Sequence, residues 1–168
     1  YMIYQEGIYV GYRYFDSFGV NPAFPFGHGL SYTDFAITFD SLAAKGSCIT
    51  INANVKNTGN RPGKEVVQLY VSAPECRLEM PRVELRAFQK TKRLAPGESQ
   101  EIILTVRPEQ LASYDEKLAA WVLFQGEYRI FVGNSVRNLA LAGSYINAAE
   151  RITEQAENRC AAVKLPKR

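Results

Sequence analysis

Short runs in which apolar and polar residues alternate recur from Phe35 onward, and they constrain the fold more than any other feature. The clearest apolar series are Ile49, Ile51, Ala53 and Val55, then Ile102, Leu104 and Val106, then Tyr128, Ile130 and Val132. Alternate side chains of a strand face opposite sides of a sheet, so each run predicts a strand with one buried face. About seven or eight such runs, separated by turn residues, predict an all-β fold, a two-sheet antiparallel sandwich.

The connections between the runs carry further predictions. The segment 57–63 is rich in Asn, Gly and Pro, and we expect the strands that it joins to be antiparallel neighbours. Prolines 74 and 81 indicate an exposed excursion over 72–82. The stretch 108–114 begins with proline and predicts one helical turn that crosses between the sheets.

Some predictions concern single side chains and the tail. We expect Leu85 and Phe88 to point into the core, and Trp121 to lie in it. The tail 146–168 is dominated by Ala, Glu, Gln and Arg. Its apolar residues follow helix-like spacing at Ile146, Ala149, Ile152 and Ala156. The tail therefore predicts either a short surface helix or an unstructured linker.

The stretch Phe24–Thr33 reads Phe-Pro-Phe-Gly-His-Gly-Leu-Ser-Tyr-Thr and is neither a regular helix nor a central strand. Pro25 lacks a backbone donor, and the two glycines permit turns. Because the stretch is too apolar for a free linker, we interpret it as a rigid connector. Residues 1–23 are also dense in aromatic rings, with a short extended piece expected within 6–16. Such rings predict that this arm covers the surface of another domain.

Composition narrows the function classes. The net charge is +3, and the one sustained basic block is Lys164–Arg168, so neither a nucleic-acid nor a membrane partner is indicated. The longest apolar runs are too short to span a bilayer. Three cysteines without a Cys-x-x-Cys spacing argue against a disulfide framework and against zinc. We therefore expect no metal and no cofactor, and a reducing, bacterial cytoplasmic location in preference to a secreted one.

No catalytic constellation emerges from the sequence. The single histidine, His28, lies between two glycines, and we expect it to make a hydrogen bond within the connector rather than to act in catalysis. Hydrolysis of a glycosidic bond needs two positioned carboxyl groups. We expect the carboxylates of this chain to be solvated at strand edges and turns rather than paired for catalysis. Those considered are Glu65, Glu84, Glu98, Glu101, Asp115 and Glu127. Gly126–Gly133 brackets a strand and is no phosphate loop. An aromatic sugar-binding platform remains an alternative.

Several motifs resemble family 3 glycoside hydrolases, at the junction where an α/β-sandwich domain leads into a fibronectin type III-like domain. They are Glu-Gly-Ile-Tyr-Val-Gly-Tyr-Arg-Tyr-Phe-Asp at 6–16, the connector 24–33, Val-Lys-Asn-Thr-Gly at 55–59, Gly-Lys-Glu-Val-Val-Gln-Leu-Tyr-Val at 63–71, Glu-Leu-Arg-Ala-Phe at 84–88, Leu-Ala-Pro-Gly-Glu-Ser at 94–99, and 126–133. The resemblance spans roughly residues 3–145 in order. It implies an immunoglobulin/fibronectin type III-like sandwich over 34–145, preceded by a junction arm over 1–33 and followed by a tail or linker over 146–168.

The resemblance also implies a function. Members of this family are retaining β-glycosidases whose catalytic aspartate and glutamate lie upstream of this junction, so no catalytic residue is carried over. The chain would be a non-catalytic accessory domain of a β-glucosidase- or β-xylosidase-like enzyme. It would pack on the barrel and α/β-sandwich domains, and shape the rim of the substrate cleft. The expected docking residues are Tyr9, Tyr12, Tyr14, Phe24, Phe26, His28 and Tyr32. The rival hypothesis is a carbohydrate-binding module that recruits polysaccharide through exposed aromatics.

Overall fold

The computed structural model describes residues 6–45 and 48–157, which form ten strands, one short α-helix and one 3₁₀ turn. In chain order the elements are α1 (Tyr12–Ser17), β1 (Phe35–Lys45), β2 (Cys48–Asn57), β3 (Val66–Ser72), β4 (Glu84–Lys90), β5 (Ser99–Val106), η1 (Pro108–Leu111), β6 (Ser113–Asp115), β7 (Ala120–Leu123), β8 (Gly126–Ser135), β9 (Asn138–Asn147) and β10 (Arg151–Gln155). The predicted all-β fold is confirmed. The helical turn expected near Pro108 is present as η1, whereas 6–16 contains helix α1 where an extended piece was expected.

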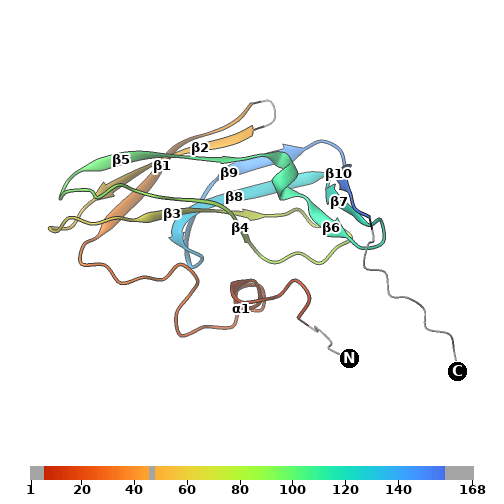
Figure 1. The fold of residues 1–168 in the computed structure, drawn as a ribbon, viewed down its shortest axis with the longest axis horizontal. Helices are drawn as coiled ribbons and strands as arrows, with labels where there is room; N and C mark the ends of the chain where they lie inside the picture. The colour runs from red at the N-terminus through yellow and green to blue at the C-terminus, as the bar shows by residue number, and fades with distance from the viewer. Residues whose placement is uncertain (1–5, 46–47, 158–168) are drawn as a thin grey trace, which may run out of the picture.

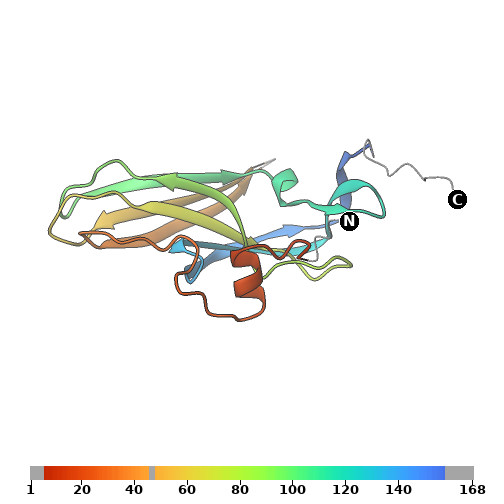
Figure 2. The ribbon, with the colours of Figure 1, turned by 60° about the horizontal axis from the view of Figure 1, so that its bottom comes forward.

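Two antiparallel sheets face each other across the core (Figures 1 and 2). One sheet has the strand order β1-β2-β5, and the other has the order β4-β3-β8-β9. A third, smaller sheet has the order β10-β7-β6, and we call it the small sheet. It lies at the end of the molecule where η1 is seen in Figure 1.

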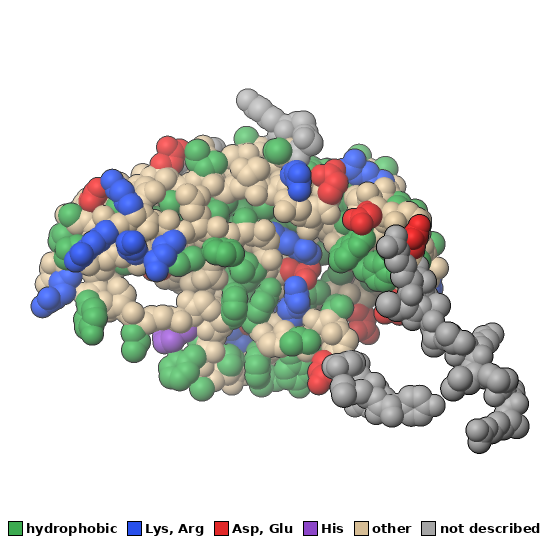
Figure 3. Space-filling view, viewed as in Figure 1, with side chains coloured by type: hydrophobic (Ala, Val, Ile, Leu, Met, Phe, Trp, Pro, Cys, Tyr) green, Lys and Arg blue, Asp and Glu red, His purple; other side chains and the backbone are tan. Residues whose placement is uncertain are grey.

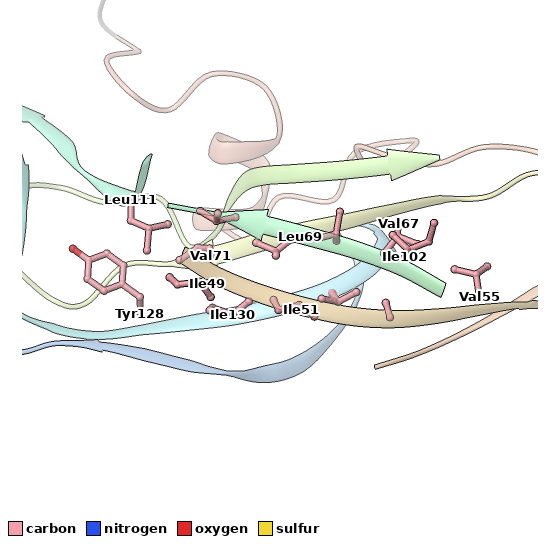
Figure 4. Close-up of a cluster of buried hydrophobic side chains, with 14 of the residues drawn as sticks. Ile49, Ile51, Val55, Val67, Leu69, Val71, Ile102, Leu111, Tyr128 and Ile130 are labelled. Carbon is pink, nitrogen blue, oxygen red and sulfur yellow. The ribbon is translucent and has the colours of Figure 1, made fainter. Parts of the chain in front are cut away.

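The core contains the alternating residues that the sequence assigned to it. Ile49, Ile51, Ala53 and Val55 of β2 are all buried, as are Ile102, Leu104 and Val106 of β5. They pack against Val67, Leu69 and Val71 of β3 and against Tyr128, Ile130 and Val132 of β8 (Figure 4). Burial of each such side chain contributes about 1.5–3 kcal/mol relative to an exposed position, so these four strands supply most of the apolar stabilisation.

The segment 57–63 crosses between the two large sheets, so the prediction that it joins neighbouring strands is wrong. β2 pairs with β1 and β5, whereas β3 pairs with β4 and β8. A loop rich in Asn, Gly and Pro marks a change of chain direction. It does not specify whether the following strand joins the same sheet or the opposite one.

Phe88 was expected in the core, but it lies exposed on β4. The β3–β4 register shifts between Leu69 and Tyr70, so that Ala87 faces the core while Leu85 packs against Tyr70 on the opposite side of the sheet. A bulge of this kind adds a residue to one strand and changes the face that later side chains occupy. Leu85 is therefore an anchor, but of an outer cluster.

The small sheet changes two further expectations. The segment 72–82 is irregular, but it is not simply an exposed excursion, because Cys76, Leu78 and Met80 pack against one face of β7. That face carries Ala120 and Val122. Trp121 lies between these two residues in sequence and therefore points to the other face of the small sheet, where it is exposed. The tryptophan expected in the core is thus a surface residue.

The described part of the tail contains a strand where a helix or a linker was expected. β10 pairs antiparallel with β7, and Ala156 donates its backbone N–H to the carbonyl of Ala119 just beyond the strand. Without β10, β7 would have an unpaired edge, and pairing outweighs the weak helix-like spacing of the tail. The rest of the tail, 158–168, lies outside the described residues.

Candidate functional site

The candidate site is the N-terminal arm, which we define as residues 6–33. Helix α1 and the irregular chain after it run along the outer face of the β4-β3-β8-β9 sheet (Figures 1 and 2). From Gly19 to Thr33 the arm contains no helix or strand, as predicted for the connector. The arm has one face toward the sandwich and another toward solvent, and the two faces differ in chemistry.

Tyr12 anchors the inner face of the arm. Its ring stacks on Phe26, with ring centroids 4.8 Å apart, and meets Tyr70 of β3 edge-on at 6.0 Å. Its hydroxyl oxygen accepts a hydrogen bond of 2.9 Å from the backbone N–H of Leu85. These contacts close a second hydrophobic cluster, outside the main core, around the buried residues Tyr70, Val83 and Val136.

Ion pairs fix α1 beside this cluster. Asp16 lies one turn after Tyr12, and its side chain is only 2% exposed. It pairs with Arg137, in the turn between β8 and β9, and more distantly with Arg82, at 3.9 Å. On the same helix, Arg13 pairs with Glu84 of β4 at 2.9 Å. Because Asp16 is buried between cations from other segments, these pairs specify how the helix is seated.

A second attachment lies in the connector. The carbonyl of Phe26 accepts a 3.0 Å hydrogen bond from the backbone N–H of Val136. The next residue, Gly27, has a φ of +85° and lies against Gln68, which leaves no room for a Cβ. Gln68 in turn accepts a 2.6 Å hydrogen bond from the Tyr70 hydroxyl. Burial raises the pKa of Tyr70, and the nearby Tyr12 and Asp16 raise it further, so its phenol stays neutral and donates this bond.

The outer face of the arm is apolar and largely unpartnered. Leu30 is 96% exposed, Tyr32 is 93% exposed and Phe24 is 72% exposed. In Figure 3, hydrophobic side chains gather along the lower edge of the molecule, next to the purple His28. An isolated exposed apolar residue is ordinary, but several large ones gathered along one edge mark a surface that binds another surface.

The seven predicted docking residues divide between the two faces. Tyr12 points inward, and Tyr9 is half-buried against Phe18, with ring centroids 4.9 Å apart. Tyr14, Phe24, His28 and Tyr32 face solvent, whereas Phe26 is partly exposed and stacks on Tyr12. The ring of His28 stacks on Phe24 at 5.1 Å, and its backbone N–H donates to the carbonyl of Pro25.

Sequence reasoning missed the polar residues that seat the arm. Asp16, Arg82 and Arg137 are separated by 66 and 55 residues, so no local pattern connects them. The available signal was the spacing of Tyr12 and Asp16, which places both on one face of a helical turn. Leu30, an exposed neighbour of Tyr32, was also left out of the predicted docking set.

Several carboxylates expected to be solvated are engaged. Asp115 is buried and accepts a 2.8 Å hydrogen bond from Arg77. Glu84 is shared by Arg13 and Arg86. Within residues 6–45 and 48–157 no group of three His, Cys, Asp or Glu side chains is placed to hold a metal ion. Cys48 and Cys76 carry free thiols, and Cys160 lies outside the described residues.

Two open hollows on the described surface do not assemble catalytic chemistry. One, of about 440 Å³, lies beside the segment 72–82 and has Glu75 as its carboxylate. The other, of about 500 Å³, lies beside η1, and its carboxylate, Glu109, is paired with Arg151. Neither hollow contains the two carboxyl groups that glycosidic hydrolysis requires. No helix in the described part of the chain is long and apolar enough to cross a membrane.

Comparison with known proteins agrees with this fold. Residues 65–136 match the family model of the fibronectin type III-like domain. β-Glucosidase A of Butyrivibrio fibrisolvens is 42% identical over 193 aligned residues, which take in all of this chain and 23% of the relative. β-Glucosidase 3B of Thermotoga neapolitana, solved in complex with α-D-glucose, superposes with a TM-score of 0.85 and 44% identity, over 91% of this chain and 21% of that one. A β-glucosidase from Paenibacillus barengoltzii superposes with a TM-score of 0.87 and 40% identity, over 92% of this chain and 18% of that one.

The antiparallel sandwich and the family match together define a fibronectin type III-like domain. The chain carries the version of this domain that matches the C-terminal part of family 3 β-glucosidases, as its motifs predicted. It spans only about a fifth of the length of these relatives, between 18% and 23%. In those relatives the matched part is one portion of a longer chain, which leaves room for other domains.

Proposed function

We propose that the chain is a non-catalytic accessory domain of a retaining, β-glucosidase-like enzyme, and that it acts by packing on and stabilising the catalytic domains. The observation that carries this proposal is the apolar outer face of the arm. Leu30, Tyr32 and Phe24 are the most exposed of the large apolar side chains on the arm, and transfer of each from water to an interface is favourable by about 1.5–3 kcal/mol. The relatives are four to five times longer than this chain, so a parent enzyme of that length would have other domains on which this apolar surface could pack.

The way the arm is seated supports the same role. A surface that docks well is held in its bound shape beforehand, because ordering it on binding costs conformational entropy. Here Tyr12, Asp16 and Gly27 fix the inner face of the arm to the sandwich, so its outer residues are presented on a supported backbone. We further propose that the arm forms part of the rim of the substrate cleft of the parent enzyme.

The first test separates an accessory role from catalysis. The purified chain is assayed for hydrolysis of an aryl β-glucoside, alone and after mixing with the catalytic domains of its parent enzyme. We expect no hydrolysis by the chain alone, and a higher melting temperature of the catalytic domains after mixing. Hydrolysis by the chain alone would overturn the proposal.

The second test locates the docking surface. The double variant Leu30→Ser/Tyr32→Ser removes two large apolar side chains that make little contact with the sandwich. It should abolish the gain in melting temperature. The matched control is Ile103→Ser, which removes an exposed apolar residue from β5, in the sheet that the arm does not cover. If the double variant and the control raise the melting temperature of the catalytic domains equally, the docking contact lies outside Leu30 and Tyr32.

A further inference from the structure

The small sheet carries a row of three residues across its outer face. Tyr114 of β6 is the direct register partner of Trp121 of β7, and Trp121 pairs with Glu154 of β10 immediately after a register shift between Ile152 and Glu154. Direct partners such as Tyr114 and Trp121 project from the same face, with their Cβ atoms about 5 Å apart, and Glu154 borders Trp121 on its other side. The opposite face of β7 packs on the segment 72–82, so this row faces away from the protein.

The geometry of the row leaves the indole accessible. The rings of Tyr114 and Trp121 have centroids 5.6 Å apart and planes inclined at 60°. The tyrosine therefore contacts the indole without stacking over it, and Trp121 remains 42% exposed. The Thr153 hydroxyl donates to the carbonyl of Trp121 at 3.2 Å, which ties β10 to β7 next to the row.

The chemistry of this face differs from that of the arm. Glu154 is exposed, and its carboxylate forms no ion pair with any residue in 6–45 or 48–157. An exposed indole beside an unpaired carboxylate suits a ligand with one apolar face and a rim of hydroxyl groups. A purely apolar protein surface would leave the Glu154 charge desolvated and unpaired, which is unfavourable.

We propose that Tyr114, Trp121 and Glu154 form a binding site for a β-linked glucopyranose unit of an oligosaccharide or polysaccharide. In β-glucopyranose the ring substituents are equatorial, so both faces present axial C–H groups. These electron-poor hydrogens meet the negative face of the indole. A sugar hydroxyl then donates a charge-assisted hydrogen bond to the Glu154 carboxylate. The site shares no residue with the docking face of the arm, and it does not depend on the docking role.

The single tryptophan of the chain makes the site directly measurable. Titration of the full chain with cellotetraose should change the intensity and the emission maximum of Trp121 fluorescence, with saturation in the millimolar range. A flat titration to tens of millimolar would overturn the proposal. Isothermal titration calorimetry on the same samples gives an affinity that remains measurable when the tryptophan is replaced.

Three variants test the assigned roles. Trp121→Ala should abolish calorimetric binding of cellotetraose, and Glu154→Gln should weaken it by about tenfold, as expected for loss of one charge-assisted hydrogen bond. Phe88→Ala removes an exposed aromatic residue from β4, outside the small sheet, and should leave the affinity unchanged. Glu154→Gln alters an exposed side chain, so it should fold even if Trp121→Ala does not. Unchanged affinity in Glu154→Gln would contradict the proposed row.

Discussion

Asn57 joins three separate segments through one buried side chain. Its Oδ1 accepts hydrogen bonds from the Thr33 hydroxyl, at 2.7 Å, and from the backbone N–H of Gly59, at 3.1 Å. Its Nδ2 donates to the carbonyls of Arg61 and Leu94, at 2.8 and 3.0 Å. The amide thus uses its donors and its acceptor at the point where the arm enters the sandwich and where the chain crosses between the sheets.

Replacement of this amide by a carboxylate should be costly. Asn57→Asp keeps the shape of the side chain but loses both donors, and it sets a buried charge against two carbonyl oxygens. We expect the free energy of unfolding at neutral pH to fall by about 2–4 kcal/mol. Urea unfolding followed by circular dichroism measures the change. The control is Asn60→Asp, an exposed position in the same loop, which should stay within about 0.5 kcal/mol of the parent chain.

Gly27 is a second position where one residue type is required. An added Cβ would lie 2.6 Å from Nε2 of Gln68 and 2.9 Å from Cα of Ser135, at a φ of +85°. Gly27→Ala should therefore reduce the free energy of unfolding by about 1–3 kcal/mol. Gly29→Ala is the matched control, since nothing lies within 4 Å of its added Cβ. Similar unfolding midpoints for the two variants would show that the connector is not held against Gln68.

At the scale of elements, the strands with a fully alternating pattern were predictable from the sequence. β2 and β5 follow the expected alternation because each has one face on the core and none of its apolar residues is displaced by a bulge. The candidate site was predictable to the extent that its exposed rings, such as Phe24 and Tyr32, lie in the segment that the aromatic density marked.

The predictions that were wrong or missing concern residues whose surroundings are set by segments distant in the sequence. Phe88 faces outward because of a bulge against β3, and the strand in the tail exists because β7 has an edge to pair with. Asp16 is buried against Arg82 and Arg137, which are distant from it in the sequence. Local patterns carry no information on such pairings, because period and turn chemistry describe only neighbours along the chain.

The segment 72–82 is tied to the small sheet by a network that depends on pH. Arg77 binds Asp115 at 2.8 Å and Glu150 at 2.8 Å, and its guanidinium lies over the ring of Phe124. Burial alone would raise the pKa of the Asp115 carboxyl. Hydrogen bonds from Arg77 and from the backbone N–H groups of Leu118 and Lys117 outweigh burial, so the pKa lies below its ordinary value.

The lowered pKa of Asp115 fixes the direction of the pH effect. The folded state binds this proton less readily than the unfolded chain, so the stabilisation is present above the unfolded pKa of about 3.9 and is lost as pH falls through the folded pKa. We expect the melting temperature to drop below about pH 4 and to drop less steeply in Asp115→Asn. Differential scanning calorimetry from pH 7 to pH 2.5 makes the comparison. If the melting temperatures of the parent chain and of Asp115→Asn fall in parallel with pH, Asp115 does not contribute to the loss of stability in acid.

Deletion of residues 1–23 tests whether helix α1 belongs to the sandwich. The deletion uncovers Tyr70 and Leu85 and leaves Arg137 without Asp16. We expect a melting temperature lower by about 5–10 °C, together with an unchanged β-sheet signal in far-UV circular dichroism. An unchanged melting temperature would show that the helix contributes nothing to the stability of the sandwich. Loss of the β-sheet signal would make the arm essential to folding.

At the scale of the whole molecule, the two sides of the arm differ: its ion pairs bind the sandwich, whereas its large apolar side chains face solvent. The side facing the sandwich holds the ion pairs of Arg13 and Asp16 and the ring of Tyr12. The side facing solvent holds Phe24, Leu30 and Tyr32. The domain on its own therefore exposes the apolar surface that we assign to its partner, and the net charge of +3 provides little repulsion between copies.

This exposed surface should make the isolated chain associate with itself, and Leu30→Ser/Tyr32→Ser should relieve the association. Both side chains are almost fully exposed, so the double variant should unfold at the same temperature as the parent chain. Sedimentation velocity at increasing concentration should show a rising weight-average sedimentation coefficient for the parent chain and a constant one for the variant. Ile103→Ser serves as the control and should behave like the parent chain. If the double variant also behaves like the parent chain, the apolar face of the arm does not drive association, and the case for it as the docking surface is lost.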